Sequence, residues 1–191
     1  MADSTQPILN IVGDKVALGP LSRELLYELD LTWGNDFEVT KTHGKPSSPV
    51  TAEMVAAKYE RILQAHDELW FLLYERSTLR PIGTTFFSQM VRLYQTAEFN
   101  LTIGAKDCWG RGYGTETTRL MLRYAFATLG FNMIWLRVHS TNQRGVQAYL
   151  RAGFREAGRL REAQRRGQEA IDVVYMDCLA RDFLASELQP V

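Results

Sequence analysis

The segment "CWGRGYGTETTRLMLRYAF", residues 108–126, places three glycines at alternating positions directly before an amphipathic helical pattern. Glycine carries no Cβ, so Gly110, Gly112 and Gly114 leave several backbone N–H groups unshielded by side chains. The helix that follows opens with four unpaired N–H groups and a partial positive charge. Such an end suits an anion, above all a phosphate or pyrophosphate, and Arg111 in the same turn adds a cation.

Three phosphate-binding patterns compete with a plain glycine turn at this segment. A Walker loop requires Gly-Lys-Ser/Thr after its second glycine, and that sequence is absent. A dinucleotide fingerprint reads G-x-G-x-x-G and lies near the first strand, whereas this G-x-G-x-G lies past the middle of the chain. The third pattern is a strand that leads into x-x-G-x-G/A and then a helix, which resembles the acyl-coenzyme-A loop of the GNAT acetyltransferases.

The strand expected before the glycines, "AEFNLTIG" (97–104), alternates between an apolar and a polar face. The apolar face holds Phe99, Leu101 and Ile103, and the polar face holds Glu98, Asn100 and Thr102. A central strand normally buries both faces in apolar surroundings. The polar row therefore predicts a wet or reactive cleft on one side of this strand.

Downstream, "NQRGVQAYLRAGF" (142–154) predicts a helix with Asn142 as its N-cap and Gly153 as its end. Tyr149 follows Asn142 by seven residues, which is about two helical turns, or ~10 Å, on nearly the same face. The two side chains can therefore meet one extended ligand at two places.

Taken together, the segments resemble the RimJ/RimL-like, ribosomal-protein N-acetyltransferase branch of the GNAT superfamily. The resemblance includes "VALGPLSRELLYELD", "WGNDFEV" and "DVVYMDCLARDF", and the Asn-to-Tyr helix is similar to that of spermidine N-acetyltransferases. There are two departures. Trp109 stands three residues before Gly112, where many GNATs carry Gln or Arg, and Gly145 stands where the ribosomal-protein enzymes often carry serine.

The resemblance implies an α/β (α+β) GNAT fold with a central mixed, mostly antiparallel sheet of about seven strands and helices on both faces. The order of the expected elements agrees with this fold. Strands that look antiparallel come early in the chain, and an alternation of strand, helix, strand, helix and strand follows. A single acetyltransferase domain is expected over residues 1–191, with a core at about 12–182 and short flexible termini.

The resemblance also implies that acetyl passes from acetyl-coenzyme A (acetyl-CoA) directly to a primary amine in a ternary complex, without a metal. A bulged strand before the glycine loop would polarise the thioester carbonyl through a backbone N–H. Tyr149 would protonate the departing thiolate, and Glu98 would act as the base, directly or through water, unless it is a structural carboxylate. Trp33 and Asp36 would lie at the acceptor entrance. The residues implied to bind the coenzyme are Ile103, Gly104, Trp109, Gly110, Arg111, Gly112, Tyr113, Gly114, Thr115 and Asn142.

Composition limits the remaining classes. Lysine plus arginine equals aspartate plus glutamate at 22 each, which argues against a dedicated nucleic-acid binder. No apolar run approaches the ~18 residues of a membrane span, the start lacks a signal-peptide layout, and a cytoplasmic monomer or homodimer is expected. The acceptor would be a small-molecule or peptide amine. Two alternatives remain open: a coenzyme-binding module without turnover, and another nucleotide-dependent enzyme.

Overall fold

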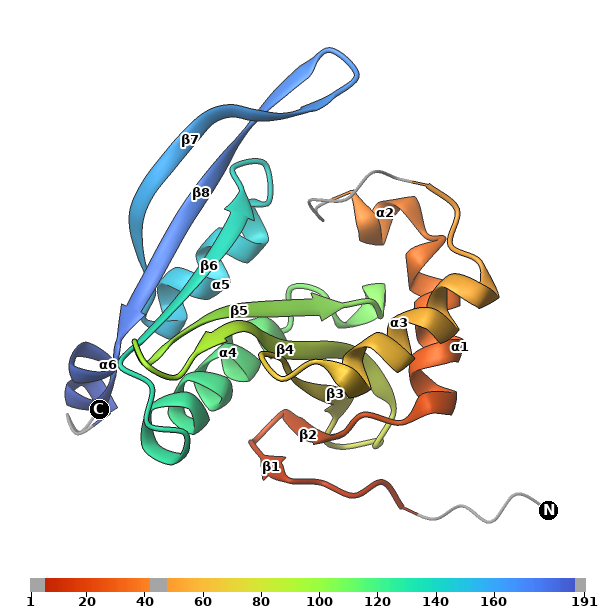
Figure 1. The fold of residues 1–191 in the computed structure, drawn as a ribbon, viewed down its shortest axis with the longest axis horizontal. Helices are drawn as coiled ribbons and strands as arrows, with labels where there is room; N and C mark the ends of the chain where they lie inside the picture. Colours follow the sequence, from red (N-terminus) through yellow and green to blue (C-terminus); the bar gives the residue numbers. More distant parts are fainter. Residues whose placement is uncertain (1–5, 42–47, 188–191) are drawn as a thin grey trace.

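The computed structural model describes residues 6–41 and 48–187 as a sheet covered by helices (Figure 1). The N-terminal half holds β1 (Ile11–Val12), β2 (Val16–Pro20), α1 (Arg23–Gly34), α2 (Phe37–Thr40), α3 (Ala52–Gln64), β3 (Leu69–Glu75), β4 (Pro81–Val91) and β5 (Thr96–Ile103). The C-terminal half holds the 3₁₀ turn η1 (Lys106–Cys108), α4 (Tyr113–Arg123), the π-helical η2 (Tyr124–Thr128), β6 (Met133–His139), α5 (Gln143–Ala152), β7 (Arg155–Arg166), β8 (Glu169–Leu179) and α6 (Ala180–Glu187).

The eight strands form one sheet in the order β1-β2-β3-β4-β5-β6-β8-β7. Every neighbouring pair is antiparallel except β5 and β6, which are parallel, so the expected mixed, mostly antiparallel sheet is confirmed. The expected number of about seven strands is one short of the observed eight. Strand β1 has only two residues, too few for an alternating pattern to reveal it.

The parallel pair β5–β6 separates after a short contact. Pairing runs only from Thr96, opposite Met133, to Glu98, opposite Trp135. Strand β6 then continues beside β8 as far as His139, while β5 continues beside β4. The second half of β5 therefore has an edge with no neighbouring strand, and the sheet opens at its centre.

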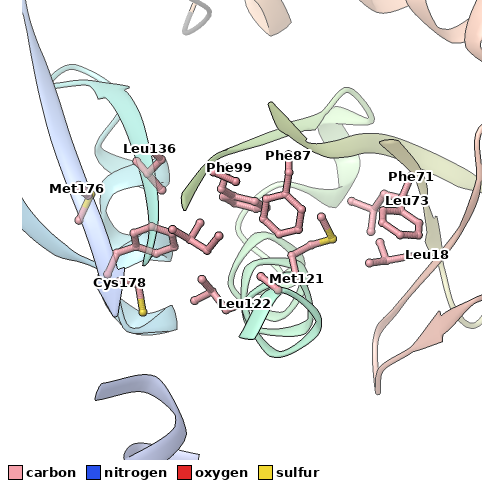
Figure 2. Close-up of a cluster of buried hydrophobic side chains, with 14 of the residues drawn as sticks. Leu18, Phe71, Leu73, Phe87, Phe99, Met121, Leu122, Leu136, Met176 and Cys178 are labelled. Atoms are coloured by element: carbon pink, nitrogen blue, oxygen red, sulfur yellow. The ribbon is translucent and has the colours of Figure 1, made fainter. Parts of the chain in front are cut away.

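The main core lies between the sheet and α4 (Figure 2). Met121 and Leu122 of α4 are fully buried, and they point toward Phe87 of β4 and Phe99 of β5. This helix is strongly amphipathic, so one apolar stripe is enough to attach it to the sheet. The packing fixes the start of α4 directly beside the end of β5.

The remaining helices and the last hairpin surround the opening. Helices α1 and α3 pack against each other on the other side of the sheet, and α5 packs beside α4. Strands β7 and β8 form a long hairpin that projects beyond the sheet (Figure 1). The polar segment 161–166 has no apolar alternation, yet it continues β7, and its residues 164–166 pair with β8.

No helix within the described residues combines the length and apolar character needed to cross a membrane.

Candidate active site

A cleft of about 1300 Å³ occupies the opening between β5, α5 and the start of α4. It brings together most of the residues that the sequence singled out. Those that line it are Trp33, Glu98, Ile103, Trp109, Gly110, Gly112, Tyr113, Gly114, Thr115, Asn142 and Tyr149. Asp36, Gly104 and Arg111 are not part of its lining.

The glycine turn presents an open helix N-terminus to the cleft. Gly110 (φ +76°) and Gly112 (φ +86°) adopt left-handed conformations that other residues enter only at a cost. Gly112 is the N-cap of α4 and provides no side-chain oxygen, so the first-turn N–H groups have no side-chain cap. A Cβ at Gly114 would meet only ordinary contacts, which means that this position does not require glycine for its backbone.

The charged neighbours of this turn are arranged differently from the sequence expectation. The Arg111 guanidinium lies 3.3 Å from Glu75, whose buried carboxylate also accepts a hydrogen bond from the Tyr113 hydroxyl at 2.7 Å. The Arg111 guanidinium and the Tyr113 hydroxyl are therefore both engaged with Glu75, which does not line the cleft. Instead, the Lys15 Nζ donates to the Arg111 carbonyl at 3.3 Å and lies 3.3 Å from the place of a Cβ on Gly112. Lys15 is therefore a cation beside the glycine turn, and no sequence pattern indicated it.

The free half of β5 directs backbone groups into the cleft. The Gly104 N–H donates to the Ile82 carbonyl, and in the antiparallel ladder the bonded positions then alternate back along β5. The N–H groups of Leu101 and Ile103 consequently point away from β4, toward the open edge. The register with β4 is regular from Glu98 to Ile103, so this orientation arises without the bulge that the resemblance implied.

Trp109 closes one end of this open edge. Its indole Nε1 donates to the Ile103 carbonyl at 2.7 Å, and the Arg144 guanidinium lies 4.0 Å above its ring. The residue that replaces the expected Gln or Arg is thus fixed to the end of β5 and carries a cation from α5. Arg144 also lines the cleft, although no sequence motif drew attention to it.

Glu98 is buried within a network of donors. Its carboxylate accepts two hydrogen bonds from Arg137 of β6, at 2.8 and 3.1 Å, and one from the Gln89 amide at 2.8 Å. The bond to Glu98 raises the pKa of the Arg137 guanidinium. The pair joins β5 to β6 just where the two strands separate, which is the arrangement of a structural carboxylate.

Helix α5 places Asn142 and Tyr149 on the cleft, as the seven-residue spacing predicted. The Asn142 Oδ1 accepts from the Gly145 N–H at 3.0 Å and caps the helix, which leaves its Nδ2 for other partners. The Tyr149 ring packs edge-on against Phe99 and Phe154. Burial raises the pKa of the Tyr149 hydroxyl to about 12, so the phenol stays protonated over the physiological range.

The family model of the acetyltransferase (GNAT) domain matches residues 15–155, a span that runs from the start of β2 through the cleft to α5. The chain belongs to the GNAT family. Its observed sheet, with the opening beside the start of α4, is the GNAT fold that the sequence predicted.

Individual GNAT relatives agree. The chain is 26% identical over 113 residues to the uncharacterized N-acetyltransferase p20 of Bacillus licheniformis and 31% identical over 102 residues to the probable N-acetyltransferase YjcK of Bacillus subtilis. These alignments cover 59% and 53% of this chain. They cover 63% and 56% of the two relatives, less than two thirds of the length of either.

Solved GNAT structures share the fold over nearly the whole chain. A spermidine N-acetyltransferase from Vibrio cholerae, in complex with CoA and spermine, aligns with a TM-score of 0.79 at 23% identity and covers 89% of this chain and 98% of that one. A GNAT-family acetyltransferase from Bacillus anthracis aligns with a TM-score of 0.75 at 18% identity, covering 90% and 98%.

The two residues predicted at the acceptor entrance of this GNAT domain have different roles in the structure. Trp33 of α1 packs directly on the backbone of Gly104, where its ring atoms lie within about 2 Å of the place of any Cβ. Asp36 instead caps α2 through the Glu38 N–H and forms an ion pair with Lys106 at 2.7 Å. Trp33 lines the cleft, whereas Asp36 holds α2 against η1.

Sequence patterns missed the aromatic wall of the cleft. Trp70 of β3 and Phe86 of β4 stack with ring centroids 3.6 Å apart, and both line the cleft. Trp70 lies in β3 and Phe86 in β4. Their pairing across two strands depends on register, and local alternation does not reveal register.

Proposed function

We propose that this protein is an N-acetyltransferase that moves an acetyl group from acetyl-CoA to a primary amine. The observation that carries the proposal is the unpaired half of β5, which lies beside the open N-terminus of α4 in one cleft. Backbone donors for a thioester and backbone donors for a diphosphate therefore belong to the same site.

The cleft offers partners to two parts of acetyl-CoA, the diphosphate and the acyl-pantetheine arm. The first-turn N–H groups of α4, with Gly112 leaving room and Lys15 close by, would hold the diphosphate. The N–H groups of Leu101 and Ile103 would bind along the pantetheine arm and the thioester carbonyl. Asn142 would offer its free Nδ2 to the polar groups of that arm. When bound, the coenzyme supplies an acyl group activated as a thioester.

The chain itself would stabilise charge and orient the reacting groups. The amine would attack the carbonyl carbon and the C–S bond would break, and the proton that the amine loses would pass through water to the departing thiolate, so that coenzyme A leaves as its free thiol. Backbone N–H groups on β5 would stabilise the negative charge that develops on the carbonyl oxygen. Tyr149, with a pKa of about 12, would donate a hydrogen bond to the departing sulfur, whose thiolate has an ordinary pKa of ~8.5. Tyr149 thus assists a leaving group that is already stable.

Within the family, we propose the RimJ/RimL-like branch, on the strength of "VALGPLSRELLYELD", "WGNDFEV" and "DVVYMDCLARDF". We also propose that residues 12–182 form one catalytic domain, because a single sheet runs from β1 to β7. The cytoplasm, which supplies acetyl-CoA, is the proposed location.

Calorimetry with purified protein tests the coenzyme assignment, and release of free CoA thiol with a mixture of amines tests turnover. We expect acetyl-CoA to bind at micromolar to millimolar concentration and thiol release to require an amine. NAD and ATP should not compete. Absence of binding at millimolar acetyl-CoA would overturn the proposal, and binding without thiol release would leave only a coenzyme-binding module.

A further inference from the structure

One half of the cleft has an aromatic wall, formed by Trp70 and Phe86. Trp70 and Phe86 are direct partners in the β3–β4 ladder, and their rings are parallel to within 8°. The Lys58 ammonium lies 5.1 Å above the Trp70 ring and covers its outer side. Among the described residues, no second ring or cation stacks on Phe86. The face of Phe86 toward β5 thus carries neither a ring nor a cation from the described residues, and Phe86 lines the cleft.

The next position in the same row is Asn100, the ladder partner of Phe86 on β5. Its side chain turns along the strand and donates to the Ser88 hydroxyl at 2.9 Å. Asn100 lies one strand spacing, about 4.8 Å, from Phe86, the same spacing across which Trp70 and Phe86 stack. A flat group bound there would form the third layer of the stack, directly beside the open edge of β5.

The charges of this half do not favour a polycation. Three of its carboxylates already have cationic partners: Asp30 with Lys58 at 2.5 Å, Glu68 with Arg61 at 2.6 Å, and Glu98 with Arg137 at 2.8 Å. Asp67 is the remaining carboxylate among the described lining residues, and it is exposed. A molecule with three or four ammonium groups would find little uncompensated negative charge here.

We propose that the acceptor is a monoamine with an aromatic ring a few bonds from the amino group, stacked on Phe86, and that polyamines are poor acceptors. This inference rests on the proposed function and specifies its substrate class. Free arylalkylamines and N-terminal aromatic residues of peptides share this chemistry.

A substrate series on the unmodified protein tests the proposal without any variant. Tryptamine and phenethylamine represent free arylalkylamines, phenylalanine amide and the dipeptide Phe-Gly represent peptide ends, and butylamine and spermidine are the comparisons. We expect kcat/KM for the best aromatic amine to exceed that for butylamine about 10-fold and that for spermidine by more. Whichever of the first two pairs has the higher kcat/KM shows whether the aromatic ring belongs to a free arylalkylamine or to the N-terminal residue of a peptide.

The variant Phe86→Leu keeps an apolar side chain but removes the stacking surface. We expect KM for the aromatic amine to rise about 3- to 10-fold, with KM for butylamine unchanged. Tyr94→Leu, which removes an exposed aromatic ring in the β4–β5 turn, is the matched control and should change neither value. Thermal unfolding checks that both variants are folded.

The proposed substrate class and the proposed N-acetyltransferase function can be overturned separately. If spermidine or butylamine is acetylated as well as the aromatic amines, the substrate class is wrong while the N-acetyltransferase function stands. An equal rise in KM for butylamine and aromatic amines in Phe86→Leu would likewise remove stacking as the cause. If acetyl-CoA binds but no amine of the series is acetylated, the aromatic substrate class is overturned, and thiol release with the wider amine mixture decides separately whether the N-acetyltransferase function stands.

Discussion

The Tyr149 hydroxyl shows how burial determines what a single residue can contribute. Its ring packs against Phe99 and Phe154, and burial raises the pKa of the phenol to about 12. A phenol of that pKa remains a hydrogen-bond donor at every pH at which the protein would work. Full proton transfer to a thiolate of pKa ~8.5 is unfavourable, so its effect on the rate should be moderate.

We expect Tyr149→Phe to lower kcat by about 10- to 100-fold, because the departing sulfur loses its donor. The affinity for acetyl-CoA, measured by calorimetry, should stay within about two-fold, since the ring packing is kept. Between pH 6 and 9 the ratio of the two kcat values should be constant, because the pKa of Tyr149 lies well above that range. An unchanged kcat throughout this range would exclude the donor role.

His139, at the end of β6, is a second residue whose burial has a measurable effect. Neither ring nitrogen has a hydrogen-bond partner among the described residues, and the side chain is 5% exposed. Burial lowers the pKa of His139 below its ordinary value of 6.5. The folded protein therefore binds fewer protons at this residue than the unfolded chain once the pH falls below 6.5.

Because the folded pKa is lowered, the contribution of His139 to stability is fully present above pH 6.5 and is lost as the pH falls through the folded value. The slope is at most about 1.4 kcal/mol per pH unit. Urea unfolding at pH 7.5 and at pH 5.5 measures this effect. The free energy of unfolding should fall less between these two pH values in His139→Leu than in the unmodified protein. His66→Leu, at an exposed position, should behave like the unmodified protein. Equal losses in all three would contradict the assignment.

At the scale of elements, the start of α4 is the feature that combines backbone and function. Gly110 and Gly112 are left-handed, and the first-turn N–H groups face the cleft without a side-chain cap. Gly112→Glu would introduce a carboxylate where a diphosphate is expected, and we predict that acetyl-CoA binding falls at least 100-fold. The measurement is calorimetry.

Gly130 provides a matched control for this variant. It is also left-handed (φ +72°), with open space at the place of a Cβ, but it lies beyond the other end of α4. Gly130→Glu should cost a similar ~1–2 kcal/mol of backbone strain and leave acetyl-CoA binding unchanged. Comparable loss of binding in both variants would mean that Gly112 acts through folding alone.

Elements with local signals were predicted well. Helix α5 runs from Gln143 to Ala152 between the expected N-cap Asn142 and the expected end Gly153, since both signals lie in the segment itself. The end of β7, "REAQRR", has no apolar alternation, and its strand conformation depends on pairing with β8. Lys15 and Phe86 reach the site through tertiary contacts, which no local pattern encodes.

At the scale of the whole molecule, an ion pair connects the two strands that separate at the opening in the sheet. The buried Glu98 on β5 and Arg137 on β6 form two hydrogen bonds across the last paired residues of these strands. This contact joins the N-terminal and C-terminal halves of the sheet at the cleft. The sequence marked Glu98 as either a base or a structural residue, and its partners favour the structural role.

We therefore expect Glu98→Gln to lower the free energy of unfolding by about 1–3 kcal/mol while kcat/KM stays within about 10-fold. Arg137→Gln, which removes the cationic partner of the same ion pair, should lower the free energy of unfolding by a similar amount. The pH profile of kcat/KM should keep its shape in Glu98→Gln. If kcat/KM of Glu98→Gln fell 100-fold or more, and its pH profile lost the decline at acidic pH, Glu98 would instead be identified as the base.

The contact between Trp33 and Gly104 restricts how this cleft can diverge. The indole occupies the space in which any side chain at position 104 would begin. Neither site can therefore be exchanged freely: a larger residue at 104 demands a smaller one at 33. Relatives that admit bulkier acceptors past α1 should therefore carry a larger residue at 104 together with a smaller one at 33.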